Sequence, residues 1–297
     1  MKNVLIFGSS DYSEKNDSQV VAKAFGKNRA NVTFVPWEEL IFTINNSNVS
    51  IRHNDVELAD LTPDTVLAFG WYKSGRKSIY KDVAYALALY LDHHKIPYWN
   101  SEMGRQRSTG KLSCLVLLAL NNIAVTPTAY SLRGDLLMAQ ITLPAVLKAS
   151  SASRGDSNYF VDSKKQAEVL LVGMPNRLLV QPYLDNNHDL RMIMFGGKVH
   201  RILKRARRKD ATTHLNNTSQ GGSAEWISTV SVDKKLLTIC EKICKITHRE
   251  MAGIDLIPDN ISEYGYSCLE VNTIPQLTSG FDPDTKMESL VEAVLKN

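Results

Sequence analysis

Two short segments near the C-terminus carry oxygen-bearing side chains at a spacing that suits a metal ion. Glu270 and Asn272 lie two positions apart in CLEVNT, so on a strand both would project from the same face. If the segment AGIDLI pairs with that strand, Asp255 can reach the same point. Two carboxylates and an amide oxygen suit Mg²⁺, and no Cys or His stands beside them to favour zinc. These residues alone leave a solvated polar face as the alternative.

A second group of residues could bind phosphate. Lys148 ends the apolar run LPAVLK and opens a loop of small residues, 149–158. Backbone N–H groups of such a loop can surround phosphate oxygens, although a flexible surface loop with an exposed lysine is the competing interpretation. The segment GRQRSTGKL resembles a P-loop, but Leu112 stands where the hydroxyl residue should bind magnesium. It is therefore not a P-loop, although Lys111 could still reach a phosphate.

The segment KVHRILKRARRK, residues 198–209, contains eight basic side chains if His200 is counted. Such a run could bind nucleic acid. No helix-turn-helix, RNP or zinc-finger pattern accompanies it, and the net charge of the chain is only +4. An anionic small molecule or an acidic protein substrate fits the run at least as well.

Hydrophobic periodicity indicates the elements that position these residues. Strands at 4–7, 32–35 and 65–69 alternate with helices at 18–25 and 79–94, which predicts a parallel-sheet α/β domain. Beyond the junction at 97–100 the pattern becomes mixed and then antiparallel. The predicted strands are 123–130, 145–148, 177–181, 189–195, 198–204, 253–257 and 266–271, and the predicted helices are 113–120, 134–139 and 232–252. The fold class is therefore α/β, with α+β character in the C-terminal part.

Composition indicates a globular protein of 297 residues, of which 43% are hydrophobic and 22% charged. The N-terminus lacks a secretory signal, and no apolar run approaches the roughly 20 residues that span a bilayer. These features predict a cytoplasmic enzyme without a membrane partner. Cys240 and Cys244 share a helical face, but no further ligand completes a metal site, so buried structural thiols are favoured. No Ser-His-Asp or Cys-His set stands out.

Seven features occur in the order found in ATP-grasp ligases. They are Lys111, the Lys148 strand with its small-residue loop, VQPYL, HDLRMIMFGGKV, NNTSQGG, AGIDLI and LEVNTIPQLTSG. From about residue 97 to 290, the chain resembles the branch that contains ribosomal-protein glutamate ligases and bacterial glutathione synthetases. The resemblance implies an ATP-grasp fold behind a small parallel-sheet domain. The implied division is an N-terminal domain at 1–96, a central ATP-grasp subdomain at 97–180 and a C-terminal subdomain with the metal site at 181–297.

The resemblance also implies roles for individual residues. Lys111 and Lys148 would hold ATP phosphates beneath a flap that includes Ser151 and Gly155. Gln181, Pro182 and Tyr183 would form the hinge strand that reads adenine, with Pro182 in place of the usual Glu offering its carbonyl and Tyr183 its N–H. Asp189 would accept the ribose hydroxyls.

The remaining implied roles concern the reacting groups. Arg205 and Asn217 would lie near the transferred phosphate, although Arg205 could instead be one more solvated charge in a basic hairpin. For Arg191 a site role and a strand-pairing ion bridge remain open. The metal ligands, for Mg²⁺ or Mn²⁺, would be Asp255, Glu270 and Asn272, and the segment 275–280 resembles a substrate-recognition loop.

The implied function is ATP-dependent ligation of a carboxylate to an amine through an acyl phosphate, with release of ADP and phosphate. An amino acid such as glutamate would be added to a peptide, a protein tail or a small molecule, and the basic run would suit an acidic tail. One alternative is a peptide-tailoring ligase that forms amide or ester cross-links within a precursor. Another is an ATP-binding module without catalysis. The family resemblance further implies a homo-oligomer.

Overall fold

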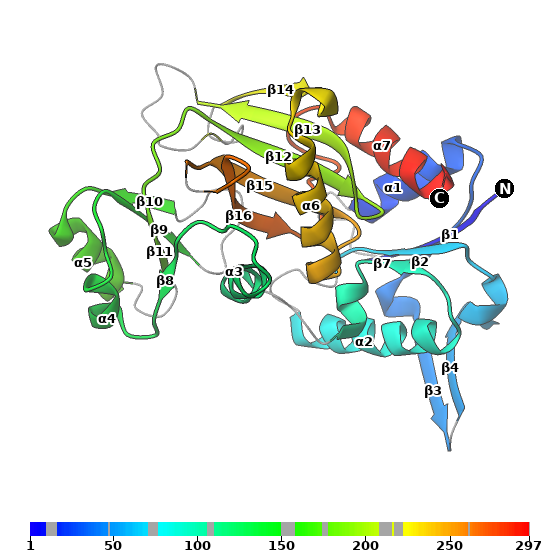
Figure 1. Cartoon of the computed structure of the whole chain (residues 1–297). Helices are drawn as coiled ribbons and strands as arrows, with labels where there is room; N and C mark the ends of the chain where they lie inside the picture. The colour runs from blue at the N-terminus through cyan, green and yellow to red at the C-terminus, as the bar shows by residue number, and fades with distance from the viewer. Residues whose placement is uncertain are drawn as a thin grey trace.

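The computed structural model of the protein describes residues 1–9, 17–46, 48–70, 77–105, 110–149, 158–173, 178–207, 216, 222–260 and 262–296. In this part of the chain the strands form four sheets, and helices pack against them (Figure 1). The mixed α/β class predicted from the sequence is confirmed. None of the described helices is both long enough and apolar enough to cross a membrane.

The N-terminal sheet is parallel and is buried on both faces. Its strand order is β2 (Asn31–Pro36), β1 (Asn3–Gly8), β6 (Thr65–Ala68) and β7 (Tyr98–Trp99). Along β1 the side chains alternate, so Val4 and Ile6 belong to one apolar cluster with α1 (Asp17–Lys27), while Leu5 and Phe7 belong to another with α2 (Lys77–His93). This two-sided burial explains the continuous apolar run from which the strand was predicted.

A small antiparallel sheet lies at the edge of this domain and was not predicted. It contains β3 (Ile41–Asn45), β4 (Asn48–His53) and β5 (Val56–Glu57) in that order. The β3–β4 hairpin projects from the body of the molecule (Figure 1), and several of its apolar side chains are exposed. A strand that buries little of its apolar surface lacks the alternation that makes strands recognisable. Short 3₁₀ helices elsewhere span Trp37–Glu39, Leu58–Leu61, Ser101–Arg105 and Thr229–Ser231.

The central sheet is antiparallel, with the order β10 (Asn158–Val161), β9 (Ala145–Ala149), β11 (Leu178–Pro182) and β8 (Ala129–Tyr130). Two helices, α4 (Gly134–Met138) and α5 (Lys164–Gly173), share an apolar cluster with this sheet. The predicted strand 123–130 is wrong for most of its length, because only its last two residues belong to β8. Pro127 lies before them, and a proline removes a donor that sheet pairing needs.

The C-terminal sheet is antiparallel and has two contrasting faces. Its order is β14 (Ser223–Ile227), β13 (Lys198–Ala206), β12 (His188–Phe195), β15 (Ala252–Pro258) and β16 (Tyr266–Asn272). The predicted β12–β13 hairpin is confirmed, and Gly196 and Gly197 both have the positive φ that a tight hairpin turn requires. Alternation places Leu190 and Met192 in an apolar cluster, whereas the residues between them, Asp189 and Arg191, carry charge.

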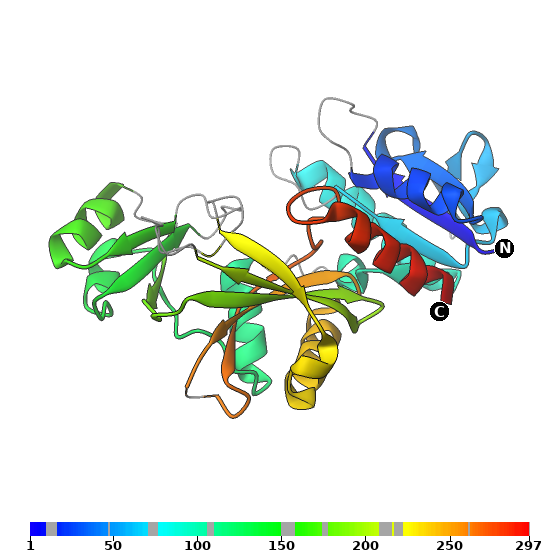
Figure 2. The same ribbon diagram turned by 90° about the horizontal axis from the view of Figure 1, so that it is seen from above.

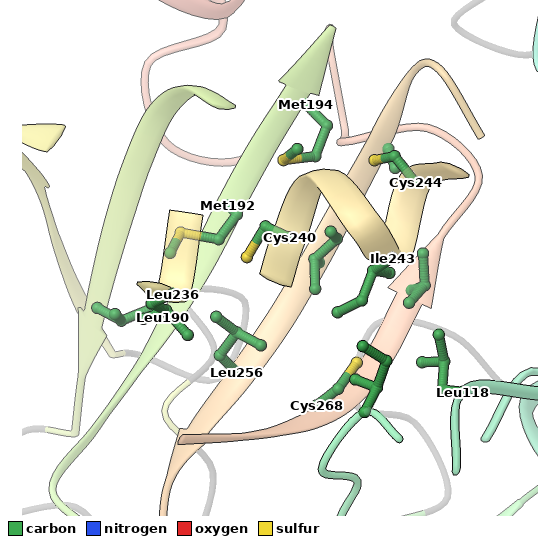
Figure 3. Close-up of a cluster of buried hydrophobic side chains, with 14 of the residues drawn as sticks. Leu118, Leu190, Met192, Met194, Leu236, Cys240, Ile243, Cys244, Leu256 and Cys268 are labelled. Atoms are coloured by element: carbon green, nitrogen blue, oxygen red, sulfur yellow. The ribbon is translucent and has the colours of Figure 1, made fainter. Parts of the chain in front are cut away.

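The apolar face packs against α3 (Lys111–Leu120) and α6 (Lys234–Thr247). Figure 3 shows this cluster, which includes Met192, Leu256, Cys240 and Cys268. All four cysteines are free and buried, as predicted for structural thiols, and burial raises the pKa of each. The helix predicted at 232–252 is too long, because His248 adopts a left-handed conformation, with φ 54°, that ends α6.

A further helix, α7 (Pro283–Lys296), was not predicted and connects two parts of the molecule. Leu290 and Val294 share an apolar cluster with β1 and α1 and with Phe195 of β12. The helix lies between the parallel sheet and the C-terminal sheet (Figure 2). The division into segments 1–96, 97–180 and 181–297 stays a prediction.

Candidate active site

The charged face of the C-terminal sheet brings predicted site residues together by strand register. Asp189 lies opposite Arg205, and Arg191 lies opposite Asp255. On the other side of β15, Glu270 lies opposite Asp255. Directly opposed side chains on one face of an antiparallel pair lie about 4.5–5.5 Å apart. Arg205 and Asp189 thus form one cross-strand pair, and Arg191, Asp255 and Glu270 form the neighbouring set. Together with Asn272, we call these residues the charged row.

Ion pairs link two arginines, Arg191 of β12 and Arg205 of β13, to Asp255 of β15. The Arg191 guanidinium contacts both oxygens of Asp255, with Nε–Oδ1 and Nη2–Oδ2 distances of 2.7 Å. Arg205 approaches Asp189 through Nε at 2.6 Å and Asp255 through Nη2 at 3.4 Å. Arg205 is only 4% exposed, so it is not a solvated charge of the basic hairpin. Arg191 forms the strand-pairing ion bridge that the sequence left open.

The environment shifts the pKa values of the two aspartates of the charged row in opposite directions. Burial alone would raise the pKa of Asp255, but the charges of Arg191 and Arg205 outweigh it and lower that pKa to about 2. For Asp189 burial wins over the single ion pair with Arg205, and its pKa is raised. Asp255 therefore carries a negative charge at every physiological pH.

The three predicted metal ligands fit a hard cation by their chemistry and placement. Asp255 and Glu270 are cross-strand neighbours, and Asn272 follows Glu270 by two residues on the same face. The Asn272 Nδ2 donates to the Gly253 carbonyl at 3.4 Å, which leaves its amide oxygen for another partner. The set consists of oxygen donors, which is the preference of Mg²⁺. Both Asp255 oxygens are engaged by arginine, so a cation would have to displace a guanidinium there.

The two predicted phosphate lysines lie on neighbouring elements beside the charged row. Lys111 is the first residue of α3, and its Nζ donates to the Ala149 carbonyl at 3.4 Å. Lys148 on β9 points away from the apolar cluster that contains its neighbours Leu147 and Ala149. Desolvation lowers the pKa of Lys148 to about 8, partly opposed by the charge of Glu270 and reinforced by that of Lys111. Two lysines and the carboxylates of the charged row therefore act on one another.

This lowered pKa predicts a pH-dependent affinity for nucleotide. Lys148 loses its charge as the pH rises through about 8, which is below the 10.5 of a free lysine. If its ammonium binds phosphate, the Kd for ADP should be constant up to about pH 8 and then rise, by at most about tenfold per pH unit for one proton. Calorimetric titration from pH 7 to 9.5 measures this. The Lys148→Met variant should bind more weakly and without that rise, and a parallel pH profile in the variant would contradict the prediction.

The predicted hinge strand is placed beside the lysines, with one correction. Gln181 is 2% exposed, and its Nε2 donates to Thr128 Oγ1 at 2.9 Å. Pro182 pairs with Ala145, and the Tyr183 N–H donates to the Pro144 carbonyl at 2.9 Å. The N–H that the sequence interpretation assigned to adenine is thus already used. Sequence reasoning could not anticipate this, because it did not define which edge of β11 faces β9.

Three predicted site residues, Ser151, Gly155 and Asn217, lie outside the described residues. The basic run is divided among different partners rather than gathered in one patch. Lys198 binds Glu241 at 2.8 Å, and Lys204 approaches Glu225 at 3.5 Å, while Arg205 belongs to the charged row. Three of the eight basic side chains are therefore paired with acidic groups, and Arg208 and Lys209 lie outside the described residues. These pairs weaken the argument that the run recognises an acidic tail.

Sequence reasoning did not single out Gln276 and Lys286. Gln276 Oε1 accepts a hydrogen bond from Arg191 Nη1 at 2.7 Å, and the Lys286 Nζ donates to the Gln276 carbonyl at 2.7 Å. Gln276 lies in the predicted substrate loop, but nothing in its type marks it as a partner of Arg191. Lys286 could have been found, because it shares the helical face of Leu290 and Val294, where a surface lysine does not belong.

Comparison with known proteins identifies the family. The model of the RimK-like ATP-grasp domain matches residues 108–293. A protein of Trichodesmium erythraeum (strain IMS101) described as a probable alpha-L-glutamate ligase is 26% identical over 210 residues, 67% of each chain.

Solved structures share the fold over the whole chain. The ATP-grasp ligase PsnB in complex with a minimal precursor has a TM-score of 0.72 at 12% identity, covering 100% of this chain and 99% of its own. The macrocyclase MdnC of Microcystis aeruginosa MRC, bound to the precursor peptide MdnA, has a TM-score of 0.67 at 12% identity, covering 99% and 100%. The ATP-grasp fold implied by the resemblance is confirmed. The chain therefore belongs to the RimK-like ATP-grasp family and is an ATP-grasp ligase.

Proposed function

We propose that this ligase activates a carboxylate with ATP as an acyl phosphate and then joins it to an amine. The observation that carries the proposal is the charged row, in which Asp255, Glu270 and Asn272 lie beside the buried Arg205 and the partly buried Arg191. The charges of Glu270 and Asp255 act on Lys148, which supports a role for this lysine at the same phosphates. Phosphoryl transfer needs such a convergence of cations, because charge spreads over the transferred group in the transition state.

ATP and Mg²⁺ are the ligands that the site fits best. Asp255, Glu270 and Asn272 would hold the metal, which neutralises phosphate charge when bound. Lys111 and Lys148, with the loop of Ser151 and Gly155, would hold the phosphates, while Asp189 would accept a ribose hydroxyl. Support comes from related folds, since structures of PsnB are described with Mg and ADP and with AMPPNP. Mn²⁺ suits the same oxygen set.

The adenine would be read by the free edge of the hinge strand. Alternate residues of a strand point their backbone groups to opposite edges. The Tyr183 N–H points to β9, so the Pro182 carbonyl and the Leu184 N–H share the other edge. We therefore assign the adenine-facing carbonyl to Pro182, as the sequence suggested, and move the adenine-facing N–H from Tyr183 to Leu184. Gln181 supports this strand through its bond to Thr128.

The chemistry proceeds in two steps. An oxygen of the substrate carboxylate forms a bond to the γ-phosphorus while the bond to the ADP oxygen breaks. The amine nitrogen then attacks the acyl carbon, phosphate leaves, and the nitrogen gives up a proton. Arg205, Asn217 and Arg191 are the residues we assign to the transferring phosphoryl and the activated acyl group. Arg205 is held by Asp189 and Arg191 by Gln276, and neither contact competes with a metal at Asp255, so the positions of both arginines are set in advance.

Two substrate classes are supported by separate observations. The likeness to a probable alpha-L-glutamate ligase favours addition of an amino acid such as glutamate to a peptide, protein tail or small molecule. The fold shared with PsnB and MdnC, both described with precursor peptides, favours a ligase that cross-links a peptide internally. A binding module without catalysis would need the same lysines and carboxylates, so only turnover separates it from the two enzymes.

The experiment that tests the proposal measures ADP release with Mg²⁺-ATP across amino acids, dipeptides, glutamate-rich peptides and acidic peptides with internal lysines. Release should require one acid and one amine, and it should vanish in the Glu270→Gln variant. A mass gain of the acceptor identifies addition, whereas loss of water within one peptide identifies cross-linking. Nucleotide binding without turnover on every pair would favour the binding module.

A further inference from the structure

Lys286 of α7 is a buried cation beneath the loop that joins β16 to α7. It is 3% exposed, and its Nζ donates to the Gln276 carbonyl at 2.7 Å and to the Ser279 carbonyl at 2.6 Å. Burial lowers the pKa of Lys286 to about 8, and the charge of Arg191 lowers it further against the opposing charges of Asp282 and Asp17. Lys286 has no ion-pair partner among the described residues, and burial of such a lysine is costly, so proteins usually retain one where its hydrogen bonds have a purpose.

Gln276 connects this lysine to the charged row. Its main-chain carbonyl accepts from Lys286, while its side-chain Oε1 accepts from Arg191 Nη1 at 2.7 Å. The remaining nitrogens of that guanidinium contact Asp255. Gln276 has a φ of 50°, an unusual conformation for a residue with a side chain, so the bonds on both sides of it must stabilise the loop. A continuous chain of polar contacts thus runs from α7 through the loop to β12 and β15.

The loop is fixed at two further points. The Thr278 hydroxyl donates to the Asp17 carboxylate of α1. On the sheet side, a Cβ added to Gly253 would lie 3.2 Å from the Pro275 Cα, so glycine there lets the loop approach β15 closely. Residues 275–280 therefore stand as a rigid wall next to Arg191 and Asp255.

The wall and Lys148 have different charged neighbours. The charges that act on Lys286 are those of Arg191, Asp282 and Asp17. Those that act on Lys148 are Glu270, Lys111, Asp255 and Asp189. Within the described residues, the side-chain hydrogen bonds of the wall reach Arg191, Asp17 and Lys286 and neither of the proposed phosphate lysines, which leaves the wall for the second substrate, the carboxylate.

We propose that Lys286 is a positioning residue for the carboxylate substrate: it fixes the 275–280 wall and, through Gln276, orients the Arg191 guanidinium toward that substrate. The inference rests on the ligase function proposed above. It assigns Lys286 no contact with ATP, so its loss should affect the acid substrate and leave the nucleotide unaffected.

The kinetic test compares Lys286→Met, Gln276→Met and the double variant with the wild type. Gln276→Met keeps the ammonium and both loop carbonyls and removes only the amide oxygen that Arg191 uses, so it covers the case in which Lys286→Met fails to fold. Each single change should raise the KM for the acid substrate about tenfold, which is the effect of losing one charge-assisted hydrogen bond. The KM for ATP should stay within about twofold of the wild-type value. The double variant should be no worse than the worse single, because both act through one link.

The matched control is Lys296→Met, on the same helix, where the lysine is exposed and pairs with Glu292. It should change neither KM. The proposal is overturned if the two single effects multiply in the double variant, or if the KM for ATP rises as much as that for the acid.

A crystal structure of Lys286→Met tests the same link without turnover. The Arg191 Nη1–Gln276 Oε1 distance, 2.7 Å in the wild type, should open beyond hydrogen-bonding range. If that contact and the wall stay in place, the proposal is wrong. A failure of the proposed function would appear elsewhere, as absence of ADP release by the wild type.

Discussion

Replacing Asp255 by asparagine should abolish ligase turnover and destabilise the protein in the same variant. The change removes a carboxylate proposed to hold Mg²⁺, and metal-assisted phosphoryl transfer depends on that charge. It also leaves Arg191 with no ion pair and Arg205 with one fewer, although both lie within or beside the buried part of the sheet. Breaking a buried pair by removing one partner costs about 3–5 kcal/mol of folding free energy.

ADP release and urea unfolding measure the two effects separately. Glu270→Gln is the matched comparison, because Glu270 forms no ion pair within the described part of the chain and faces the same proposed metal. It should lose turnover with a much smaller loss of stability. Full activity of Asp255→Asn would contradict its role in the site, and equal destabilisation by the two variants would contradict the importance of the arginine pairs.

The second large effect concerns stability alone. Arg249 and Glu102 form an ion pair of 2.9 Å, and both are nearly inaccessible, at 3% and 2% exposed. Arg249 also donates through Nη1 to the Val271 carbonyl in β16 at 2.5 Å. Arg249→Met should therefore lower the free energy of unfolding by about 3–5 kcal/mol, since it leaves the Glu102 carboxylate buried without this counter-charge.

Urea denaturation measures the predicted loss of stability, and two further comparisons test its cause. Adding Glu102→Gln to Arg249→Met removes the buried carboxylate charge and should restore a large part of the lost free energy of unfolding. Arg133→Met breaks an exposed pair with Asp135 and should have little effect, because water solvates both groups. If Arg133→Met and Arg249→Met lowered the free energy of unfolding by the same amount, burial would not be the cause of the loss at Arg249.

The sequence was most informative where a strand alternates between a core and a site. In β12, β15 and β16 the period of two separates core residues such as Leu190 and Ile254 from charged-row residues such as Asp189 and Asp255. Once the segments pair as antiparallel strands, this alternation defines the row without further information. That is why a metal site could be predicted from three residues spread over two segments.

The features that the sequence missed depend on contacts between distant segments. The pattern of β11 does not say which edge faces β9, so the N–H of Tyr183 was assigned to adenine although Pro144 uses it. The helical face of Lys286 marks it as unusual, but its bond to the loop of Gln276 exists only once α7 is packed against that loop. The separate partners of Lys198 and Lys204 likewise appear only in three dimensions, where a run that looks like one basic patch becomes several pairs.

The placement of α7 has a consequence for how the chain reaches its native state. Leu290 and Val294 fill the cluster that Val4, Ile6 and Phe25 leave open on one side of the parallel sheet. On a ribosome, where synthesis runs at about 5–20 residues per second, those early residues emerge long before the helix that covers them. The parallel sheet must therefore leave an apolar surface exposed until residues 283–296 have been made. Ordering of the 275–280 loop and burial of that surface are then late, coupled events, because α7 also carries Lys286, which donates to two carbonyls of this loop.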